Sequence, residues 1–270
     1  MFKVERGNSK WAEQIANENS CPSFTSVLAG NSSGEIWINK LDNPCFALVY
    51  SKPVGGFSIL GKLNNQEEYL SFKSFLEGEL FKELKENRTT TFEFSVDLID
   101  AEEDILKLFD EYDINIEQEL TYMRLPMQEE KIINKAPNYE FLEVIKKTIT
   151  SDFVNIEFMT KRILEAWGSI EVYLKHGKGF IAVENNKIIS IILGTAFYDK
   201  KLAIDIETLE EYKNKGIATK LTELLINSCK NKNITAYWNC MKSNIASEKT
   251  AVRVGFNFID ERNFYLLNFT

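Results

Sequence analysis

Residues 178–208 constrain the fold more than any other part of the chain, because β-prone runs alternate there with tight turns. Residues 179–183 and 187–197 are apolar runs on either side of Asn185-Asn186, a pair that suits a two-residue hairpin turn. Over 202–207, apolar side chains alternate with small or acidic ones, as in a half-buried strand. The sequence therefore predicts a three-stranded antiparallel meander.

The segments on both sides of this meander show helical periodicity or short apolar runs. Apolar residues recur at helical spacing over 217–230, and Ser169 suits the N-cap of a helix. We predict helices over 152–166, 169–175, 217–230 and 246–254, and further strands over 234–238 and 256–269. Helices and strands in this succession are typical of an α+β unit.

The chain also contains a weak internal repeat with an offset of 143 residues. The offset superimposes a glycine, a turn pair and an acidic triplet: Gly34 on Gly177, Asp42-Asn43 on Asn185-Asn186, and 67–69 on 210–212. We predict two copies of one α+β unit, a first domain over 1–126 and a second over 127–270. Each copy should have a mostly antiparallel central sheet flanked by helices.

Charge, cysteine and hydropathy patterns narrow the classes of function. The formal net charge is −8 and no basic stripe is present, which argues against nucleic acid as a partner. One histidine and four cysteines without a CxxC pair argue against a Cys/His metal site. No apolar run is long enough to cross a bilayer and no leader segment is visible, so we expect a cytoplasmic protein without membrane contacts.

The segment 213–219 joins the third meander strand to the long helix and carries the clearest chemical signal. Gly216 permits unusual backbone angles and close approach of a ligand. The amides at the start of the helix would favour an anion, and Lys213 and Lys215 add positive charge. The segment predicts a diphosphate cradle. It is neither a P-loop, because the Gly-Lys-Ser/Thr ending is missing, nor a Rossmann loop, because an antiparallel meander precedes it.

This combination of strand, loop and helix resembles the coenzyme A site of the GNAT acyltransferase superfamily. Lys213, Gly216 and Ala218 stand at the spacings of the family's loop pattern, although Lys213 replaces the usual Arg or Gln. Asn244, Ser247 and Gly255-Phe256 match the second family element, at the helix that follows. The segments 204–208 and 237–240 further resemble the subgroup that includes the zwittermicin A self-resistance acetyltransferase.

The resemblance implies transfer of an acetyl group from acetyl-CoA to a small amine, by direct attack in a ternary complex. Acyl-CoA would lie in a V-shaped split between the strand that ends at Thr208 and the strand over 235–239. Asn239 and Cys240 would border the substrate pocket. The implied cofactor-binding residues are Ile206, Thr208, Lys213, Asn214, Lys215, Gly216, Ile217, Ala218, Thr219, Asn244 and Ser247. No metal is implied.

Direct attack needs a base that removes a proton from the amine, and Glu207 and Asp205 are the candidates. They share the strand face opposite Ile204 and Ile206. Three interpretations stay open: catalytic base, ligand for a cationic acceptor, and solvated strand carboxylate. The family's tyrosine that protonates the leaving thiolate corresponds here to Ala251, so no general acid is assigned.

Two further points follow from the same comparison. In the first copy, residues 70–76 match 213–219 but contain no glycine, so we expect this copy to bind no diphosphate. Because the tyrosine is missing, the alternative function is a non-catalytic acyl-CoA-binding sensor or interaction module. The identity of the amine and the oligomeric state cannot be read from the sequence.

Overall fold

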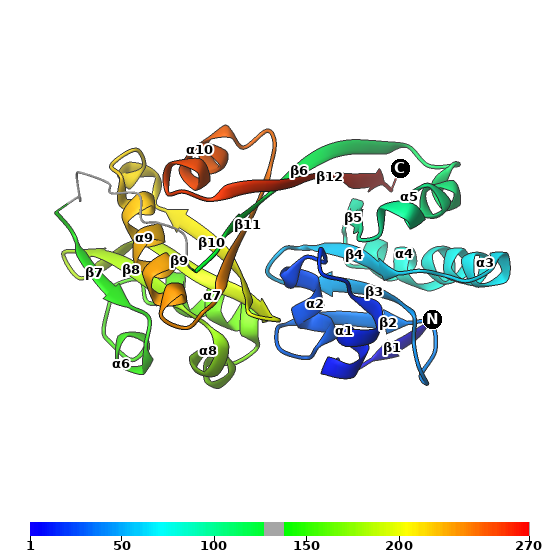
Figure 1. Ribbon diagram of the computed structural model, residues 1–270, viewed down its shortest axis with the longest axis horizontal. Coiled ribbons are helices and arrows are strands. Elements are labelled where there is room, and N and C mark those ends of the chain that lie inside the picture. Colours follow the sequence, from blue (N-terminus) through cyan, green and yellow to red (C-terminus); the bar gives the residue numbers. More distant parts are fainter. Residues whose placement is uncertain (127–137, 270) are drawn as a thin grey trace. The chain divides into compact units, whose positions relative to one another are not determined.

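The structure is a computed structural model that describes residues 1–126 and 138–269. The stretch in which the sequence predicts the domain boundary, 127–137, lies outside the described residues. The chain forms two compact units. Unit 1 comprises Met1–Glu119 with Arg262–Thr270, and unit 2 comprises Leu120–Glu261. Figure 1 labels the elements of both units.

Unit 1 contains a mixed sheet with helices against it. Its strands are β1 (Phe2–Val4), β2 (Gly34–Ile38), β3 (Phe46–Ser51), β4 (Gly56–Gly61), β5 (Thr91–Val96), the first part of β6 (Ile114–Arg124) and the last part of β12 (Asn257–Asn268). Its helices are α1 (Ser9–Ile15), α2 (Pro22–Leu28), α3 (Gln66–Phe75), α4 (Phe81–Glu86) and α5 (Ile99–Leu106), with a π-helical turn over Leu76–Leu80 and a 3-10 turn over Lys107–Phe109. Strands β1 to β4 pair antiparallel in sequence order, β4 pairs parallel with β5, and β12 pairs antiparallel with β5.

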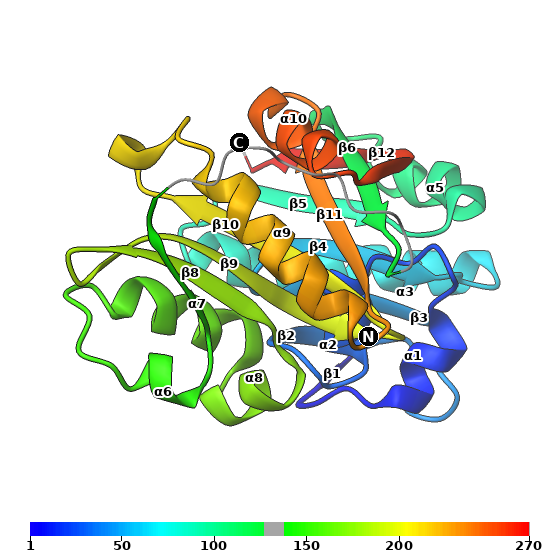
Figure 2. The same ribbon diagram turned by 60° about the vertical axis from the view of Figure 1, so that its left-hand side comes forward.

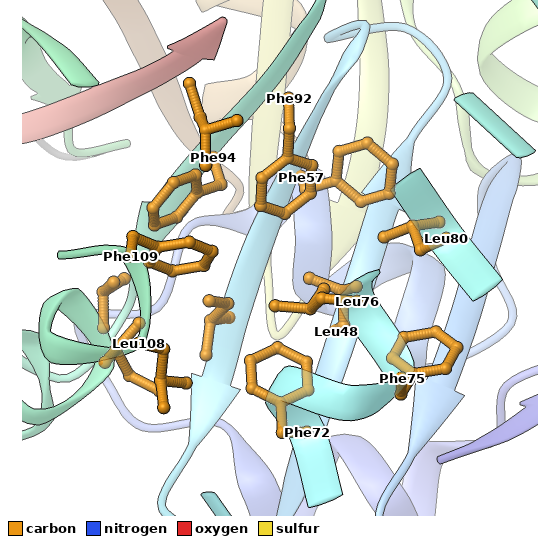
Figure 3. Packing of buried hydrophobic residues seen from close by; sticks show 14 of the residues in the cluster. Leu48, Phe57, Phe72, Phe75, Leu76, Leu80, Phe92, Phe94, Leu108 and Phe109 are labelled. Atoms are coloured by element: carbon orange, nitrogen blue, oxygen red, sulfur yellow. The ribbon is translucent and has the colours of Figure 1, made fainter. Parts of the chain in front are cut away.

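An aromatic core holds unit 1 together. Strand β5 alternates half-buried and buried side chains, so that Phe92 and Phe94 both point into the core. Figure 3 shows Phe57 and Phe92 close to each other, and their ring centroids lie 4.9 Å apart. Side chains from α3 and from the π-helical turn, among them Phe72, cover this layer of strand residues (Figure 3).

Unit 2 contains the predicted meander. Its strands are β7 (Glu140–Glu143), β8 (Gly179–Glu184), β9 (Lys187–Tyr198), β10 (Lys201–Thr208), β11 (Thr235–Met241) and the remaining parts of β6 and β12. Its helices are α6 (Lys146–Ile149), α7 (Glu157–Trp167), α8 (Ile170–His176), α9 (Ile217–Lys230) and α10 (Ile245–Arg253), with a 3-10 turn over Glu210–Tyr212. The strand order is β6-β11-β10-β9-β8-β7, and only β10 and β11 pair in parallel among the pairings resolved within this unit's described residues.

The local sequence signals explain the meander and its helices. Asn185 and Asn186 take the positive φ angles of 50° and 61° that the hairpin turn requires. Ser169 caps α8, because its hydroxyl accepts a hydrogen bond from the backbone N–H of Val172 at 3.2 Å. Figure 2 shows α9 running across strands β8 to β11. Its apolar residues pack on one sheet face, and α7 and α8 pack on the other.

The helix predicted over 152–166 begins later than expected, at Glu157. Asn155 explains the late start, because its side chain makes two hydrogen bonds to the backbone of Ile188 in β9. Its Nδ2 donates to the Ile188 carbonyl at 2.9 Å, and its Oδ1 accepts from the Ile188 N–H at 2.8 Å. This pairing holds the segment before the helix against the meander, in an irregular conformation.

The two units share a succession of elements: a three-stranded antiparallel meander, a helix, and a strand parallel to the last meander strand. The offset of 143 residues does not hold throughout, however. Residues 70–76, which it aligns with 213–219, lie within α3 and its continuation, because α3 already begins at Gln66 after the N-cap Asn65. The alignment of these two segments was therefore wrong.

The compact units also differ from the two domains expected at 1–126 and 127–270. The last strand explains the difference, because Tyr265, Leu266 and Leu267 pair with β5 and belong to unit 1. The domain limits stay a prediction. No helix within residues 1–126 and 138–269 is long and apolar enough to span a membrane.

Candidate functional site

Strands β10 and β11 are paired at one end and separate at the other. Their parallel pairing covers Lys201 to Ala203 on β10 and Thr235 to Tyr237 on β11. Strand β10 then continues to Thr208 beside β9 alone. This opening is the split that the sequence predicts between these two strands, and we call it the β10–β11 cleft.

The backbone of β10 presents alternate peptide groups to the cleft. The N–H of Leu209 donates to the Ile189 carbonyl at 2.9 Å, and the Glu207 carbonyl accepts from the Ser190 hydroxyl at 2.9 Å. Since successive residues of a strand direct their peptide groups to opposite sides, those of Ile206 and Thr208 point away from β9 and into the cleft. Their orientation agrees with the expected contact to an extended ligand.

The start of α9 supplies the second wall of the cleft. Asn214 and Gly216 have positive φ angles of 62° and 78°, which turn the chain sharply before the helix begins at Ile217. The amides of the first helical turn lack partners within the helix and favour a negative charge. A Cβ atom at Gly216 would meet no protein atom within 4 Å, so the space in front of this residue is open. The φ angle of this position favours glycine, and a side chain would project into that space.

The β10–β11 cleft encloses a cavity of about 770 Å³. Ten of the eleven predicted cofactor-binding residues line it, and Lys215 does not. The Lys215 ammonium instead lies over the ring of Tyr212, 4.6 Å from its centroid. Glu207 also lines the cavity, whereas Asp205 does not.

Sequence reasoning missed Arg253, a cation that lines the same cavity. Ser247 and Thr250 precede it on α10 and line the cavity as well. Their spacing of three residues places all three side chains on one helix face, so the helical periodicity of 246–254 contained this signal. Lys213 adds a second cation, although its ammonium pairs with Glu210 at 2.5 Å.

Asn244 and Ser247 hold each other in place at the start of α10. The Asn244 side chain accepts a hydrogen bond from the Ser247 N–H at 3.1 Å, which makes it the N-cap of the helix. The Ser247 hydroxyl accepts from Nε1 of Trp238 on β11 at 2.9 Å. Both side chains therefore have structural roles and line the cavity at the same time.

Asp205 and Glu207 lie on the same face of β10, as predicted, and share one partner that the sequence did not reveal. Arg162 of α7 donates through Nη1 to Asp205 and through Nη2 to Glu207. The two carboxylate side chains are 47% and 46% exposed, so solvent reaches both ends of the bridge. The arginine guanidinium also lies against the ring of Phe158, 5.9 Å from its centroid.

The two expected pocket residues on β11 point to opposite faces of the sheet. Asn239 donates a hydrogen bond to the hydroxyl of Thr121 on β6 at 3.2 Å. Cys240 is buried in an apolar cluster with Trp238 and Phe256. Neither residue lines the cavity. Cys240 packs on the face covered by α10, and its place in the substrate pocket stays a prediction.

A tyrosine near the cleft donates its hydroxyl hydrogen bond to a carboxylate. Tyr212 lines the cavity, but its hydroxyl donates to Glu184 at 2.6 Å. This hydrogen bond, followed by burial, raises the pKa of Tyr212 to about 12.

Ala251, the position of the family's tyrosine, is fully buried in α10. Within the part of the chain that the structure describes, no group of three His, Cys, Asp or Glu side chains could hold a metal ion.

The chain matches an acetyltransferase family model over nearly its whole length. The model of the GNAT acetyltransferase family matches residues 13–265. The chain belongs to this family. It is therefore an acyltransferase. A Bacillus subtilis (strain 168) protein described as the uncharacterized N-acetyltransferase YdfB is 24% identical over 246 residues, which cover 91% of this chain and 90% of that protein.

Solved structures show the same fold at low sequence identity. A GCN5-related N-acetyltransferase-like protein from Streptococcus suis has a TM-score of 0.57 at 13% identity and covers 87% of this chain and 88% of its own. A tandem GNAT protein from the clavulanic acid biosynthesis pathway has a TM-score of 0.57 at 10% identity, with 95% and 91% covered. The predicted α+β fold of tandem GNAT-like units is confirmed.

Proposed function

We propose that this GNAT acyltransferase moves an acetyl group from acetyl-CoA to a small amine, with the cofactor in the β10–β11 cleft. The observation that supports this most strongly is the combination of two backbone surfaces on one cavity. The free peptide groups of Ile206 and Thr208 form one, and the helix-opening amides beyond Gly216 form the other. This is a suitable lining for an extended amide chain that ends in a diphosphate.

The residues present fit coenzyme A. Open space before Gly216 leaves room for a phosphate against the amides of 217–219, and Lys213 and Arg253 supply cations on the same cavity. Asn244 and Ser247 border the path of the pantetheine arm. When bound, acetyl-CoA supplies an activated thioester. The chain itself holds the cofactor and orients it along β10. The carboxylates of β10 lie on the sheet face that α7 covers.

The acceptor side carries Asp205, Glu207 and Arg162. Two carboxylates against one guanidinium leave one net negative charge, which favours a cationic amine. Glu207 is the proposed base, because it lines the cavity and also lies on this face. Asp205 is proposed to hold Arg162, so that an incoming ammonium competes with that arginine for Glu207. Asn239, on the same face, is proposed to border the acceptor.

Unit 1 is proposed to act as a degenerate copy that binds no acyl-CoA. Its strands β4 and β5 stay paired through Ile59, whose carbonyl accepts a hydrogen bond from the N–H of Asp97 at 2.9 Å. Only Leu60 and Gly61 of β4 lie beyond this pairing, whereas β10 extends from Ile204 to Thr208 beyond its pairing with β11. The strand therefore presents less unpaired backbone than β10 does. The cytoplasmic location and the likeness to the zwittermicin A resistance subgroup stay predictions.

Release of free thiol from acetyl-CoA over a panel of primary amines tests the proposal. We expect turnover with at least one cationic amine. Glu207→Gln should keep acetyl-CoA binding and lower kcat by about 10²-fold or more, the range for loss of a general base. Glu140→Gln, an exposed strand carboxylate of β7, serves as the control and should leave kcat unchanged.

Three outcomes separate the alternatives. Unchanged turnover in Glu207→Gln would remove this residue from the mechanism. Binding of acetyl-CoA without turnover on any amine would favour the acyl-CoA sensor. Failure of acetyl-CoA to bind, or to raise the melting temperature, would contradict the assignment of the cleft.

A further inference from the structure

We propose that unit 1 contains a second binding site, for the ammonium group of a small aliphatic amine, in a cavity between its sheet and α4. The cavity has a volume of about 240 Å³. Residues from β2, β3, β4 and α4 line it, and all of them belong to unit 1. The proposal does not depend on the β10–β11 cleft, whose lining lies within unit 2.

Lys3 shows how this place accommodates an ammonium group. The Lys3 Nζ atom lies 2.5 Å from a carboxylate oxygen of Glu35 and 3.7 Å from one of Glu83. The same atom is 5.0 Å from the centroid of the Trp37 ring, within the range of a cation–π contact. Glu35, Trp37 and Glu83 all line the cavity, so a ligand ammonium in the place of Nζ would find the same three partners.

One part of the cavity lining is apolar and suits the carbon chain of an amine, while Asn87, Thr89 and Thr91 add polar groups. Tyr50 and Phe57 lie with their ring centroids 4.9 Å apart, and Leu80 and Leu84 come from the helical segment above them. Drug-sized ligands occupy pockets of roughly 300–1,000 Å³. The smaller volume here selects a short alkyl or arylalkyl chain.

The net charge around the cavity favours binding of a cation even when the ammonium of Lys3 is counted. Glu93 also lines the cavity, so three carboxylates face it while Lys3 supplies one ammonium at its edge. Burial, together with the charges of Glu35 and Glu93, raises the pKa of Tyr50. This field repels an anionic ligand of the same size and gives a neutral one no Coulombic attraction.

Lys3 can leave its place at small cost. It belongs to the three-residue strand β1, and its side chain is 50% exposed. An exposed ion pair of this kind contributes little to stability. The lysine therefore acts as a weak internal competitor, and its removal should strengthen binding of a free amine.

Binding of n-butylammonium to the full-length chain without acetyl-CoA tests the site, with neutral n-butanol as the matched probe. Titration is followed by the indole ¹H–¹⁵N signal of Trp37, assigned with Trp37→Phe. We expect Lys3→Ala to bind n-butylammonium about fivefold more tightly than the unmodified chain, the effect of losing about 1 kcal/mol of competition. Lys10→Ala, an exposed lysine of the same unit, should leave affinity unchanged.

Two further variants decide where the amine binds. In the Lys3→Ala background, the double substitution Glu35→Gln with Glu83→Gln should weaken binding about fivefold or more. Both carboxylate side chains are about half exposed, at 45% and 53%, so the fold should tolerate the change, and an unchanged melting temperature verifies this. The pair Asp205→Asn with Glu207→Gln should leave the Trp37 titration unchanged.

Equal affinity for n-butanol would overturn the proposal, since burial of the alkyl chain alone would then explain binding. So would a Trp37 signal that n-butylammonium does not move in the Lys3→Ala chain. If the Trp37 signal no longer responded to the amine in the Asp205/Glu207 variant but still responded in the Glu35/Glu83 variant, the amine would be assigned to unit 2 instead. None of these outcomes bears on whether acetyl-CoA binds the β10–β11 cleft.

Discussion

At Gly216, backbone geometry and an open ligand space coincide. Gly216→Glu places an L side chain at φ 78°, which costs about 1–2 kcal/mol, and directs a carboxylate into the cavity where a diphosphate is proposed. We expect acetyl-CoA binding to be abolished. Isothermal titration with acetyl-CoA, together with the melting temperature, measures both effects.

Gly55 provides a matched control for this substitution. It has nearly the same φ, 77°, and a Cβ atom there would also meet nothing within 4 Å, but it lies in unit 1. Gly55→Glu should therefore lose similar stability and keep acetyl-CoA binding. If Gly216→Glu still binds acetyl-CoA as tightly as Gly55→Glu does, the diphosphate is not held at the start of α9.

The ion pairs of Arg162 could not be predicted from the sequence, whereas the placement of their two acidic partners could. The alternation of β10 predicted that Asp205 and Glu207 share a face, because strand periodicity is local. Their common partner lies about forty positions earlier, on a helix whose packing on β9 is a tertiary property. No spacing rule connects the two. The same holds for Cys240, whose burial depends on α10 packing over β11.

At the scale of elements, Asn244 tests whether a helix cap also serves the ligand. Asn244→Ala removes the acceptor for the Ser247 N–H, which should cost about 0.5–2 kcal/mol of stability. Because Asn244 lines the cavity, we also expect weaker acetyl-CoA binding. Chemical denaturation gives the first quantity, and titration with acetyl-CoA gives the second.

Asn8 caps α1 in the same manner, since its side chain accepts from the Trp11 N–H at 3.0 Å. Asn8→Ala should show the loss of stability alone, because α1 belongs to unit 1. Equal acetyl-CoA affinity in the two variants would reduce Asn244 to a structural cap.

Elements were predictable where their signals are local. The meander, its Asn185-Asn186 turn and the helix over 217–230 all follow from periodicity and turn chemistry, and the structure has them. The start of α7 was not predictable, because Asn155 binds the backbone of β9 instead of extending the helix. The 143-residue offset also failed at α3, whose N-cap Asn65 begins the helix earlier than the offset implies.

At the scale of the whole molecule, the chain ends in the unit in which it begins. Arg262–Thr270 belongs to unit 1, and its strand segment pairs with β5. The Arg262 guanidinium lies 3.7 Å from the carboxylate of Asp97, a buried residue that also accepts a hydrogen bond from Ser20 at 2.5 Å. A sequence repeat cannot show to which unit the last strand belongs. Both copies contain a similar final β segment, and the pairing of strands is determined only when the sheet folds.

Substitution of Leu267 measures how much the last strand contributes to the stability of unit 1. Its side chain is fully buried in the aromatic core, and its pairing partner on β5 is Phe92. Leu267→Ala should destabilise the chain by about 2–5 kcal/mol, the range for a large-to-small change in a core. Leu266, one position earlier, is only partly buried and faces the other side of the strand, so Leu266→Ala should cost clearly less. Urea unfolding of both variants gives the comparison, and an equal or larger loss in Leu266→Ala would mean that the last strand does not enter the unit 1 core in this register.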